Sequence, residues 1–286
     1  MKKKEIRVAL LGNPNSGKTS LFNSLVGSNQ RVGNFSGVTI EKYEGVINYQ
    51  EYVITLIDLP GTYSLTAYSP EEVIARNYII EEKPDVVIDV LDGSNLERNL
   101  YLTTQVMELE VDMLIALNMY DEVTKKEIDI NFKQLQTLLG SHVIPTSATK
   151  KTGMNSILDH VIRVYEKKIK IKKNKLSYRE EIEDKIKEIS NIIKVEKHLA
   201  KYNSRWLAIK LLENDKEIYK LIKEYPIWLR IEIILQESIV EFEKKYQSDT
   251  EIAITEDRHA FVNGALQETV DFPNSKKRSI TEKIDS

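Results

Sequence analysis

The segment GNPNSGKT constrains the fold of this chain more than any other stretch. It matches the pattern G-x-x-x-x-G-K-[S/T], and it stands between a β-branched apolar run, IRVALL, and the helical pattern SLFNSLV. This strand–loop–helix arrangement predicts a P-loop, whose backbone N–H groups surround a phosphate. We expect the phosphate site to be formed by Gly12, Asn13, Pro14, Asn15, Ser16, Gly17, Lys18, Thr19 and Ser20.

Short apolar runs alternate with helical patterns through the first part of the chain, which predicts a mostly parallel sheet with helices on both faces. VTIEKYEGVINY is expected to add an antiparallel strand before YVITLID. After the lysine-rich stretch near residue 168 we find helical patterns and no convincing strand. The predicted fold is therefore an α/β P-loop domain (1–168), a smaller all-α domain (172–272) and a polar tail (273–286).

The base specificity is indicated by N-x-x-D, which follows the apolar run MLIAL. The Asp121 carboxylate can accept hydrogen bonds from the N1–H and the exocyclic amine of guanine, whereas adenine offers no such pair of donors. The Asn118 amide can tie the P-loop to this loop, and Met119 is expected to lie at the nucleotide. Backbone amides of Ser147, Ala148 and Thr149 are expected to face the guanine oxygen.

The stretch DLPG has the form of a turn that senses the γ-phosphate. Asp58 would hold Mg²⁺ through water, together with the hydroxyl groups of Thr19 and Thr39. The residue that follows is Thr62, where Ras-type GTPases carry the glutamine that orients water; we expect the Gly61 amide to do more than Thr62. The further nucleotide contacts expected in these two switch segments are Gly37, Val38, Thr39, Asp58, Leu59, Pro60 and Gly61.

Composition excludes several other classes of protein. The chain contains no cysteine, so disulfides and thiolate metal sites are excluded and a reducing cytoplasm is expected. The net charge is -3, with no basic signature of nucleic-acid binding. The longest apolar runs fall far short of the roughly 18 residues of a membrane helix, so this part of the chain is expected to be soluble.

The motifs GNPNSGKTSLFN, VGNFSGVTIEK, DLPGTYSL, YSPEEVIAR and NMYDE together resemble the N-terminal cytosolic region of the FeoB family of prokaryotic ferrous-iron transporters. The resemblance implies a G domain that hydrolyses GTP to GDP, followed by a helical domain that acts as a GDP-dissociation inhibitor. It also implies a membrane transport domain in the same full-length chain, at the cytoplasmic face of the cell membrane. Small cytosolic partner proteins and a homo-oligomer, such as a trimer around a pore, are further expectations.

The resemblance also implies how hydrolysis proceeds. Asn15 matches the P-loop asparagine that helps to hold an activating K⁺ in this family, and backbone carbonyls of residues 31–37 would complete the ion's shell. A cation beside the phosphates offsets developing charge, as an arginine finger does, which is worth about 10³ to 10⁵-fold in rate. The expected catalytic residues are therefore Asn15, Lys18, Thr39 and Gly61, with slow, K⁺-stimulated turnover.

Two other functions are compatible with the motifs alone. A ribosome-assembly or tRNA-modification GTPase can carry the same P-loop, but it usually has an RNA-binding domain, and no G-x-x-G clamp is present in the helical part. A nucleotide-bound interaction module that hardly turns over is the third candidate. RNA binding and the rate of phosphate release would separate these two from a transporter GTPase.

Overall fold

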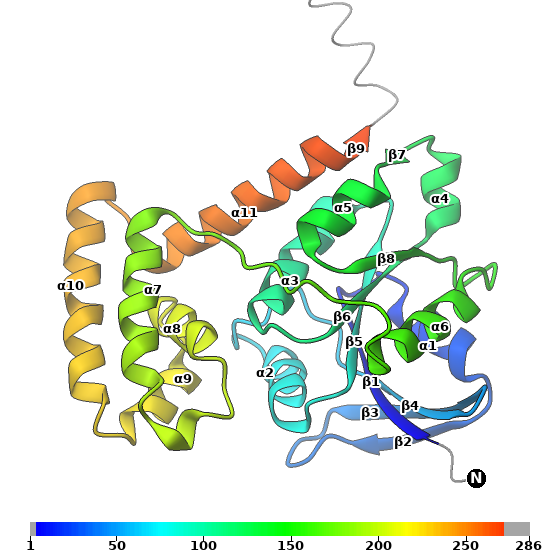
Figure 1. Cartoon of the computed structure of the whole chain (residues 1–286), viewed down its shortest axis with the longest axis horizontal. Helices are drawn as coiled ribbons and strands as arrows, with labels where there is room; N and C mark the ends of the chain where they lie inside the picture. The colour runs from blue at the N-terminus through cyan, green and yellow to red at the C-terminus, as the bar shows by residue number, and fades with distance from the viewer. Residues whose placement is uncertain (1–3, 272–286) are drawn as a thin grey trace, which may run out of the picture.

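The computed structural model describes residues 4–271. Its first domain is built around a seven-stranded sheet with the strand order β2-β3-β4-β1-β5-β6-β8 (Figure 1). Strands β4, β1, β5, β6 and β8 are parallel, whereas β2 and β3 are antiparallel additions at one edge. The sheet contains β1 (Lys4–Gly12), β2 (Gln30–Asn34), β3 (Glu41–Tyr49), β4 (Tyr52–Asp58), β5 (Val86–Asp92), β6 (Met113–Asn118) and β8 (His142–Pro145).

Helices cover both faces of this sheet because its central strands are apolar on both sides. In β5, Val86, Ile88 and Val90 belong to one buried cluster, while Val87 and Leu91 belong to the other. The G-domain helices are α1 (Lys18–Val26), α2 (Pro70–Asn77), the π-helix η1 (Tyr78–Glu82), α3 (Leu96–Glu108), α4 (Tyr120–Lys125), α5 (Phe132–Leu139) and α6 (Met154–Tyr165). The α/β fold expected for the first domain is confirmed.

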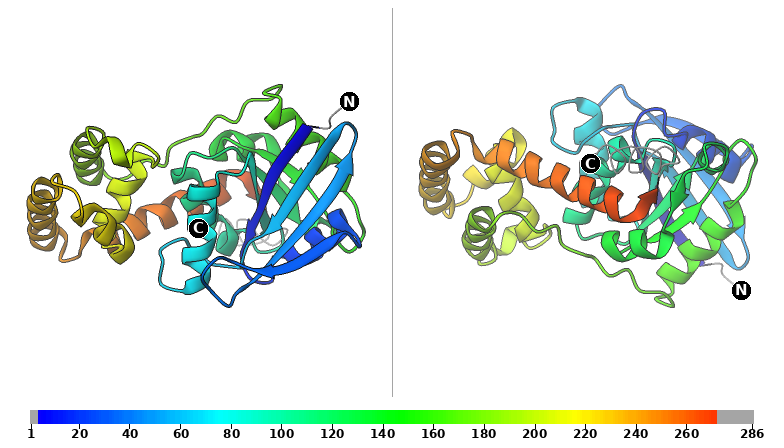
Figure 2. Two further views of the ribbon diagram at one scale, coloured as in Figure 1. Left: turned by 90° about the horizontal axis from the view of Figure 1, so that it is seen from below. Right: turned by 90° about the horizontal axis from the view of Figure 1, so that it is seen from above.

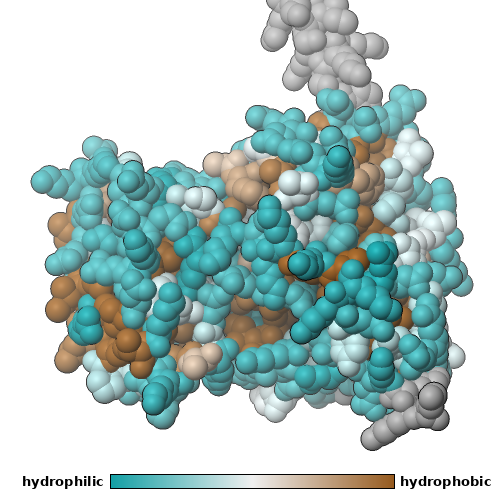
Figure 3. All heavy atoms as spheres, in the orientation of Figure 1, coloured by the Kyte–Doolittle hydropathy of each residue, from teal (hydrophilic) through white to brown (hydrophobic). Residues whose placement is uncertain are grey.

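An extended connection from residue 166 to residue 179 leads to the helical domain. Its helices are α7 (Glu180–Ile193), the short η2 (Lys197–Leu199), α8 (Ser204–Leu212), α9 (Lys216–Lys223), α10 (Trp228–Tyr246) and α11 (Thr250–Thr269). The buried face of α10 contributes Ile231 and Phe242 to the core, but Leu229, Ile233 and Val240 are exposed. Hydrophobic surface gathers at this end of the molecule, at the left of Figure 3.

Helix α11 runs back from the helical domain to the G domain, as Figure 2 shows. Its C-terminal end leads into β9 (Val270–Asp271), which pairs antiparallel with β7 (Asp129–Ile130) of the G domain. The expectation that no strand follows residue 168 is therefore wrong for these two residues. The strand was missed because two residues carry no periodicity, and β9 exists only through its pairing with a distant segment.

Residues 30–34 form an edge strand where the sequence analysis expected a loop around K⁺. They pair with β3, from Gln30 opposite Gly45 to Asn34 opposite Glu41. The loop proper is residues 35–40, closed by a hydrogen bond from the Phe35 amide to the Ile40 carbonyl (3.0 Å). Most of the expected carbonyl segment 31–37 thus lies in or beside a strand. The polar tail 273–286 falls outside the described residues.

Candidate nucleotide-binding site

The P-loop connects β1 to α1 at the carboxyl edge of the sheet, where its glycines are required by close contacts. Gly17, the N-cap of α1, has a φ of 80°, and a Cβ there would lie 2.3 Å from Asn118 Nδ2. A Cβ on Gly12 would lie 2.6 Å from the Val90 carbonyl oxygen. Neither position can accept a larger residue without moving the loop. Asn15 also has a positive φ of 68° and is exposed at the tip.

Lys18 and Asp58 form a buried ion pair between α1 and the end of β4. The Lys18 ammonium also donates to the Leu59 carbonyl (2.5 Å). Burial raises the pKa of Asp58, although Lys18 and a hydrogen bond from Thr19 act in the opposite direction. One carboxylate and one threonine hydroxyl therefore meet beside the P-loop, an oxygen donor set that fits Mg²⁺ held together with nucleotide phosphates.

Asn118 joins three parts of the site. Its Nδ2 donates to the Ser16 carbonyl (3.0 Å), and its Oδ1 accepts from the Ala148 amide (3.1 Å). The side chain is completely buried, so these hydrogen bonds are shielded from water. The P-loop, the end of β6 and the loop after β8 are thus fixed to one another. The tie that the sequence suggested between Asn118 and the P-loop is present.

Met119 has a φ of 54° and caps the N-terminus of α4, which places Asp121 in the first turn of that helix. A hydrogen bond from the Ser147 side chain is the main reason that the pKa of Asp121 is lowered, with Lys150 contributing from 3.7 Å. Asp121 is therefore an ionised acceptor at neutral pH. It stands beside the Ser147–Thr149 loop, where the sequence analysis expected guanine to be recognised.

The amides of the Ser147–Thr149 loop are arranged differently from the expectation that they face the guanine oxygen. The Ser147 amide donates to the Thr152 carbonyl (3.1 Å), and the Ala148 amide donates to Asn118. Two of the three amides are thus bonded within the protein. The sequence could not reveal this, because the partners belong to β6 and to a turn that closes on itself.

The two switch segments differ in how firmly they are held. Thr39 is exposed in the 35–40 loop, and among the described residues its side chain makes no hydrogen bond; Gly37 and Val38 beside it are exposed too. Thr62 is buried, and its hydroxyl donates to the Ser64 carbonyl (2.6 Å). The Thr62 side chain is therefore engaged within its own turn.

Glu72, which is not among the residues expected at the site, organises the rest of the second switch. It completes a capping box with Ser69 at the start of α2. It also accepts hydrogen bonds from the Ser64 hydroxyl (2.7 Å) and from the Tyr68 amide (2.8 Å). The pattern S-P-E-E was the available signal, because S-x-x-E marks a capping box, but the bond to Ser64 depends on the folded loop.

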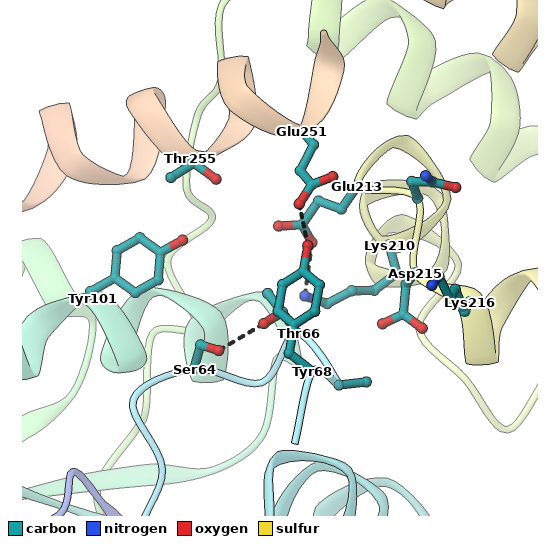
Figure 4. A pocket seen from close by; sticks show the side chains of 12 residues that line it. Ser64, Thr66, Tyr68, Tyr101, Lys210, Glu213, Asp215, Lys216, Glu251 and Thr255 are labelled. Atoms are coloured by element: carbon teal, nitrogen blue, oxygen red, sulfur yellow. Dashed lines mark hydrogen bonds and ion pairs between the residues drawn. The ribbon is translucent and has the colours of Figure 1, made fainter. Parts of the chain in front are cut away.

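A cavity of about 490 Å³ separates the second switch from the helical domain. The Tyr68 hydroxyl reaches across it to Glu251 of α11, and Tyr101, Lys210 and Thr255 also line it (Figure 4). Beside the cavity, Arg76 of α2 pairs with Asp215 at the N-cap of α9 (2.5 Å), and both side chains are buried. The segment after DLPG therefore contacts both domains.

The fold and the site define a P-loop GTPase domain to which a helical domain is attached. Residues 6–161 match the family model described as ferrous iron transport protein B, and residues 178–271 match the model of the FeoB cytosolic helical domain. The chain belongs to the FeoB family. Both domains expected from the sequence resemblance are therefore present in the order expected.

Curated relatives agree with this assignment. The chain is 41% identical over 285 residues to a fusion of Fe(2+) transport protein A with the Fe(2+) transporter FeoB from Porphyromonas gingivalis, covering 98% of this chain and 34% of that protein. It is 41% identical over 283 residues to the Fe(2+) transporter FeoB of Methanocaldococcus jannaschii, covering 99% and 41%. The chain thus spans about a third to two fifths of the length of these relatives.

Solved structures give the same result. A GDP-bound mutant of the S. thermophilus FeoB G-domain superposes with a TM-score of 0.83 at 34% identity, covering 93% of this chain and all of that chain. The cytosolic domain of the T. maritima FeoB iron transporter in its apo form gives a TM-score of 0.81 at 34% identity, with the same coverage.

Within residues 4–271, no helix is both long enough and apolar enough to cross a membrane.

Proposed function

We propose that this chain is the GTP-binding and GTP-hydrolysing regulatory part of a prokaryotic ferrous-iron membrane transporter, acting at the cytoplasmic face of the membrane. The observation that carries the proposal is the Asn118 bridge, which fixes the P-loop against the loops that hold Asp121 and Ser147. Phosphate recognition and guanine recognition then belong to one rigid site. The match of both domains to FeoB models favours this function over a ribosome-assembly or tRNA-modification GTPase.

Each nucleotide contact has a candidate residue. The P-loop amides would bind the β-phosphate, Lys18 would leave Asp58 for the β- and γ-phosphate oxygens, and Asp121 would accept from guanine. Thr19, Asp58 and Thr39 are the residues that would hold Mg²⁺, which when bound neutralises charge on the phosphates. Thr39 is exposed in its loop, so its part in this set requires that loop to close.

Hydrolysis is proposed to be slow and stimulated by K⁺ held by Asn15. The inward-facing Thr62 hydroxyl supports a mechanism in which no side chain of the DLPGT turn aims the water. The Gly61 amide and a cation beside the phosphates would then stabilise the negative charge that develops on the phosphates in the transition state. Residues 30–34 form strand β2 and pair with β3. We therefore assign the backbone carbonyls that would contact K⁺ to residues 35–37, the part of segment 31–37 that lies outside the strand.

The test compares GTP hydrolysis by the purified chain in equal concentrations of KCl and NaCl, with Mg²⁺ present. We expect faster hydrolysis in KCl, and we expect Asn15→Ala to abolish that difference while GDP binding remains. Asn29→Ala is a matched control outside the P-loop. Equal rates in the two salts, or an Asn15→Ala variant that keeps the stimulation, would remove the role of the ion. Salt-dependent RNA retention on filters would instead favour the RNA-directed alternative.

The partners of the whole protein are part of the same proposal. The curated relatives extend well beyond the matched region, which supports a membrane transport domain in the same full-length chain. The Porphyromonas gingivalis relative is fused to Fe(2+) transport protein A, which supports a small cytosolic partner. A homo-oligomer is tested by the mass of the purified chain in the presence of GDP and of a GTP analogue.

A further inference from the structure

A buried glutamine on α3 holds the backbone of the second switch. The Leu65 amide donates a hydrogen bond to Gln105 Oε1, across 40 residues of sequence. Gln105 is completely buried, and the Leu65 side chain is also buried. The bond therefore lies in the interior of the G domain, where water does not compete for the amide.

Glutamine at position 105 lowers the stability of the folded chain relative to an apolar residue of similar size. Its Nε2 has no hydrogen-bond partner among the described residues, although it is fully buried. An unsatisfied buried amide donor is destabilising, because it has lost its hydrogen bonds to water and gained none in the protein. Methionine or leucine would fill a similar volume without that cost. The hydrogen bond to Leu65 is therefore what distinguishes glutamine from an apolar residue here.

Gln105 completes a set of anchors on either side of the DLPG turn. The Leu59 amide donates to the Leu10 carbonyl (3.0 Å), and the Thr62 amide donates to the Gly12 carbonyl (3.3 Å), so the start of the turn is fixed to β1. Gln105 fixes the chain three residues after Thr62. The peptide groups of residues 61–64 are thus held between β1 and α3.

Helix α3, which carries Gln105, is held in place by contacts with two neighbouring elements. Helix α3 packs on β5, where Thr103 donates to Asp89 (2.7 Å), and on α11, where Glu108 binds Arg258. Tyr101 stacks on His259 of α11, with ring centroids 4.8 Å apart. An anchor on this helix can therefore hold the Leu65 amide in one place relative to the P-loop.

We propose that Gln105 is a positioning residue for GTP hydrolysis, which holds the Gly61–Leu65 backbone so that the Gly61 amide meets the γ-phosphate and the attacking water. The proposal rests on the proposed GTPase function. It assigns to α3 a task that the Thr62 hydroxyl does not perform from within the turn. Gln105 itself is buried, and its side chain accepts a hydrogen bond from the backbone amide of Leu65.

The test compares Gln105→Met with Gln105→Glu. Methionine keeps the volume and loses the acceptor, so we expect kcat to fall about tenfold, which corresponds to ~1.4 kcal/mol, while KM for GTP and GDP affinity stay within about twofold. Glutamate, which this buried site favours in its protonated form, keeps a carbonyl oxygen for the Leu65 amide, so we expect kcat within about threefold of the wild-type value in a variant whose thermal melt shows that it is folded. Amide hydrogen exchange at Leu65 should accelerate in Gln105→Met and stay slow in Gln105→Glu.

Thr104→Val is the matched control, because it removes a hydroxyl from the neighbouring position, where it bonds only to the Tyr101 carbonyl of its own helix (2.7 Å). It should leave kcat and Leu65 exchange unchanged. Wild-type kcat in Gln105→Met, or equal losses in Gln105→Met and Gln105→Glu, would overturn the positioning role and leave the GTPase proposal intact. A wild-type chain that does not hydrolyse GTP would overturn both.

Discussion

Arg258 of α11 and Glu108 of α3 form a two-pronged ion pair in which both side chains are fully buried, with Nε–Oε1 and Nη2–Oε2 distances of 2.7 and 2.9 Å. Glu213 of the helical domain binds the same guanidinium, and Lys210 donates to Glu213 (2.8 Å). Burial alone would raise the pKa of Glu213, but Arg258 and Lys210 overcome this effect and hold the pKa below its usual range. The two domains are therefore joined by a charge cluster whose side chains are at most 5% exposed.

Glu108→Ala is expected to destabilise the chain by about 3–5 kcal/mol, because Arg258 keeps its charge in a buried site and loses one of its carboxylates. Thermal or urea unfolding at pH 7 measures this loss. Lys245→Ala is the control, since its pair with Glu181 lies at the surface, where water screens it, so we expect a much smaller loss of stability. Equal effects of the two substitutions would show that the buried cluster adds nothing beyond a surface pair.

Asp89→Asn is expected to stabilise the protein in alkaline solution. Burial raises the pKa of Asp89 to about 7, and the hydrogen bond from Thr103 only partly opposes the rise. Between about pH 4 and 7 the folded state keeps a proton that the unfolded state has lost, so stability falls as the pH increases. Asparagine removes this dependence and should add about 1–3 kcal/mol at pH 8.

The measurement is the free energy of unfolding from pH 5 to pH 8 for the wild type and for Asp89→Asn. Asp112→Asn is the control, because Asp112 is partly exposed and pairs with Lys173 at the surface (2.9 Å). It should shift stability little at any pH. Parallel curves for Asp89→Asn and the wild type would mean that Asp89 does not titrate in this range.

Local motifs explain why so much of the site could be predicted. GNPNSGKT, DLPG and N-x-x-D each follow an apolar strand, and parallel strands bring their carboxyl ends to one edge of the sheet. The antiparallel addition of β3 to β4 also followed from local alternation and a short turn. Sequence-local geometry is therefore sufficient to predict that these motifs lie together at one edge of the sheet.

The features that could not be predicted from the sequence depend on contacts between distant segments. Gln105 is one of several polar residues of α3, and nothing in the sequence marks it until Leu65, 40 residues earlier, is folded against it. The strand at residues 30–34 is exposed and glycine-containing, and it gains its structure from β3. The cluster of Arg258, Glu108 and Glu213 joins residues up to 150 positions apart. No periodicity in one segment encodes such a partner.

Asn118→Ala is expected to weaken GDP binding at least tenfold, because the P-loop carbonyl of Ser16 and the Ala148 amide both lose a buried partner. Titration with a fluorescent GDP analogue measures the affinity. Asn131→Ala is the control: it removes an asparagine that caps α5 at Gln134 (3.1 Å), so it should lower thermal stability by about 1 kcal/mol without changing affinity. Unchanged affinity in Asn118→Ala would mean that the bridge does not organise the nucleotide site.

Asp121→Asn is expected to exchange the base specificity of the site. The carboxylate is ionised, since its pKa is lowered chiefly by the Ser147 hydrogen bond, and an ionised carboxylate suits the two donors of guanine. An amide offers one acceptor and one donor, which mismatches guanine but matches the N1–H and the C2 carbonyl of xanthine. GDP affinity should fall about 100-fold or more, and xanthosine diphosphate should bind more tightly than GDP.

Competition of the two nucleotides against a fluorescent analogue measures this exchange. Glu122→Gln is the control, because it neutralises the adjacent carboxylate, which pairs with Lys125 at the surface (3.7 Å) and has no expected contact with the base. It should bind GDP as the wild type does. If Asp121→Asn loses affinity for both nucleotides equally, then Asp121 does not recognise the base. Its role would instead be to hold the Ser147–Thr149 loop in place through its contacts with Ser147 and Lys150.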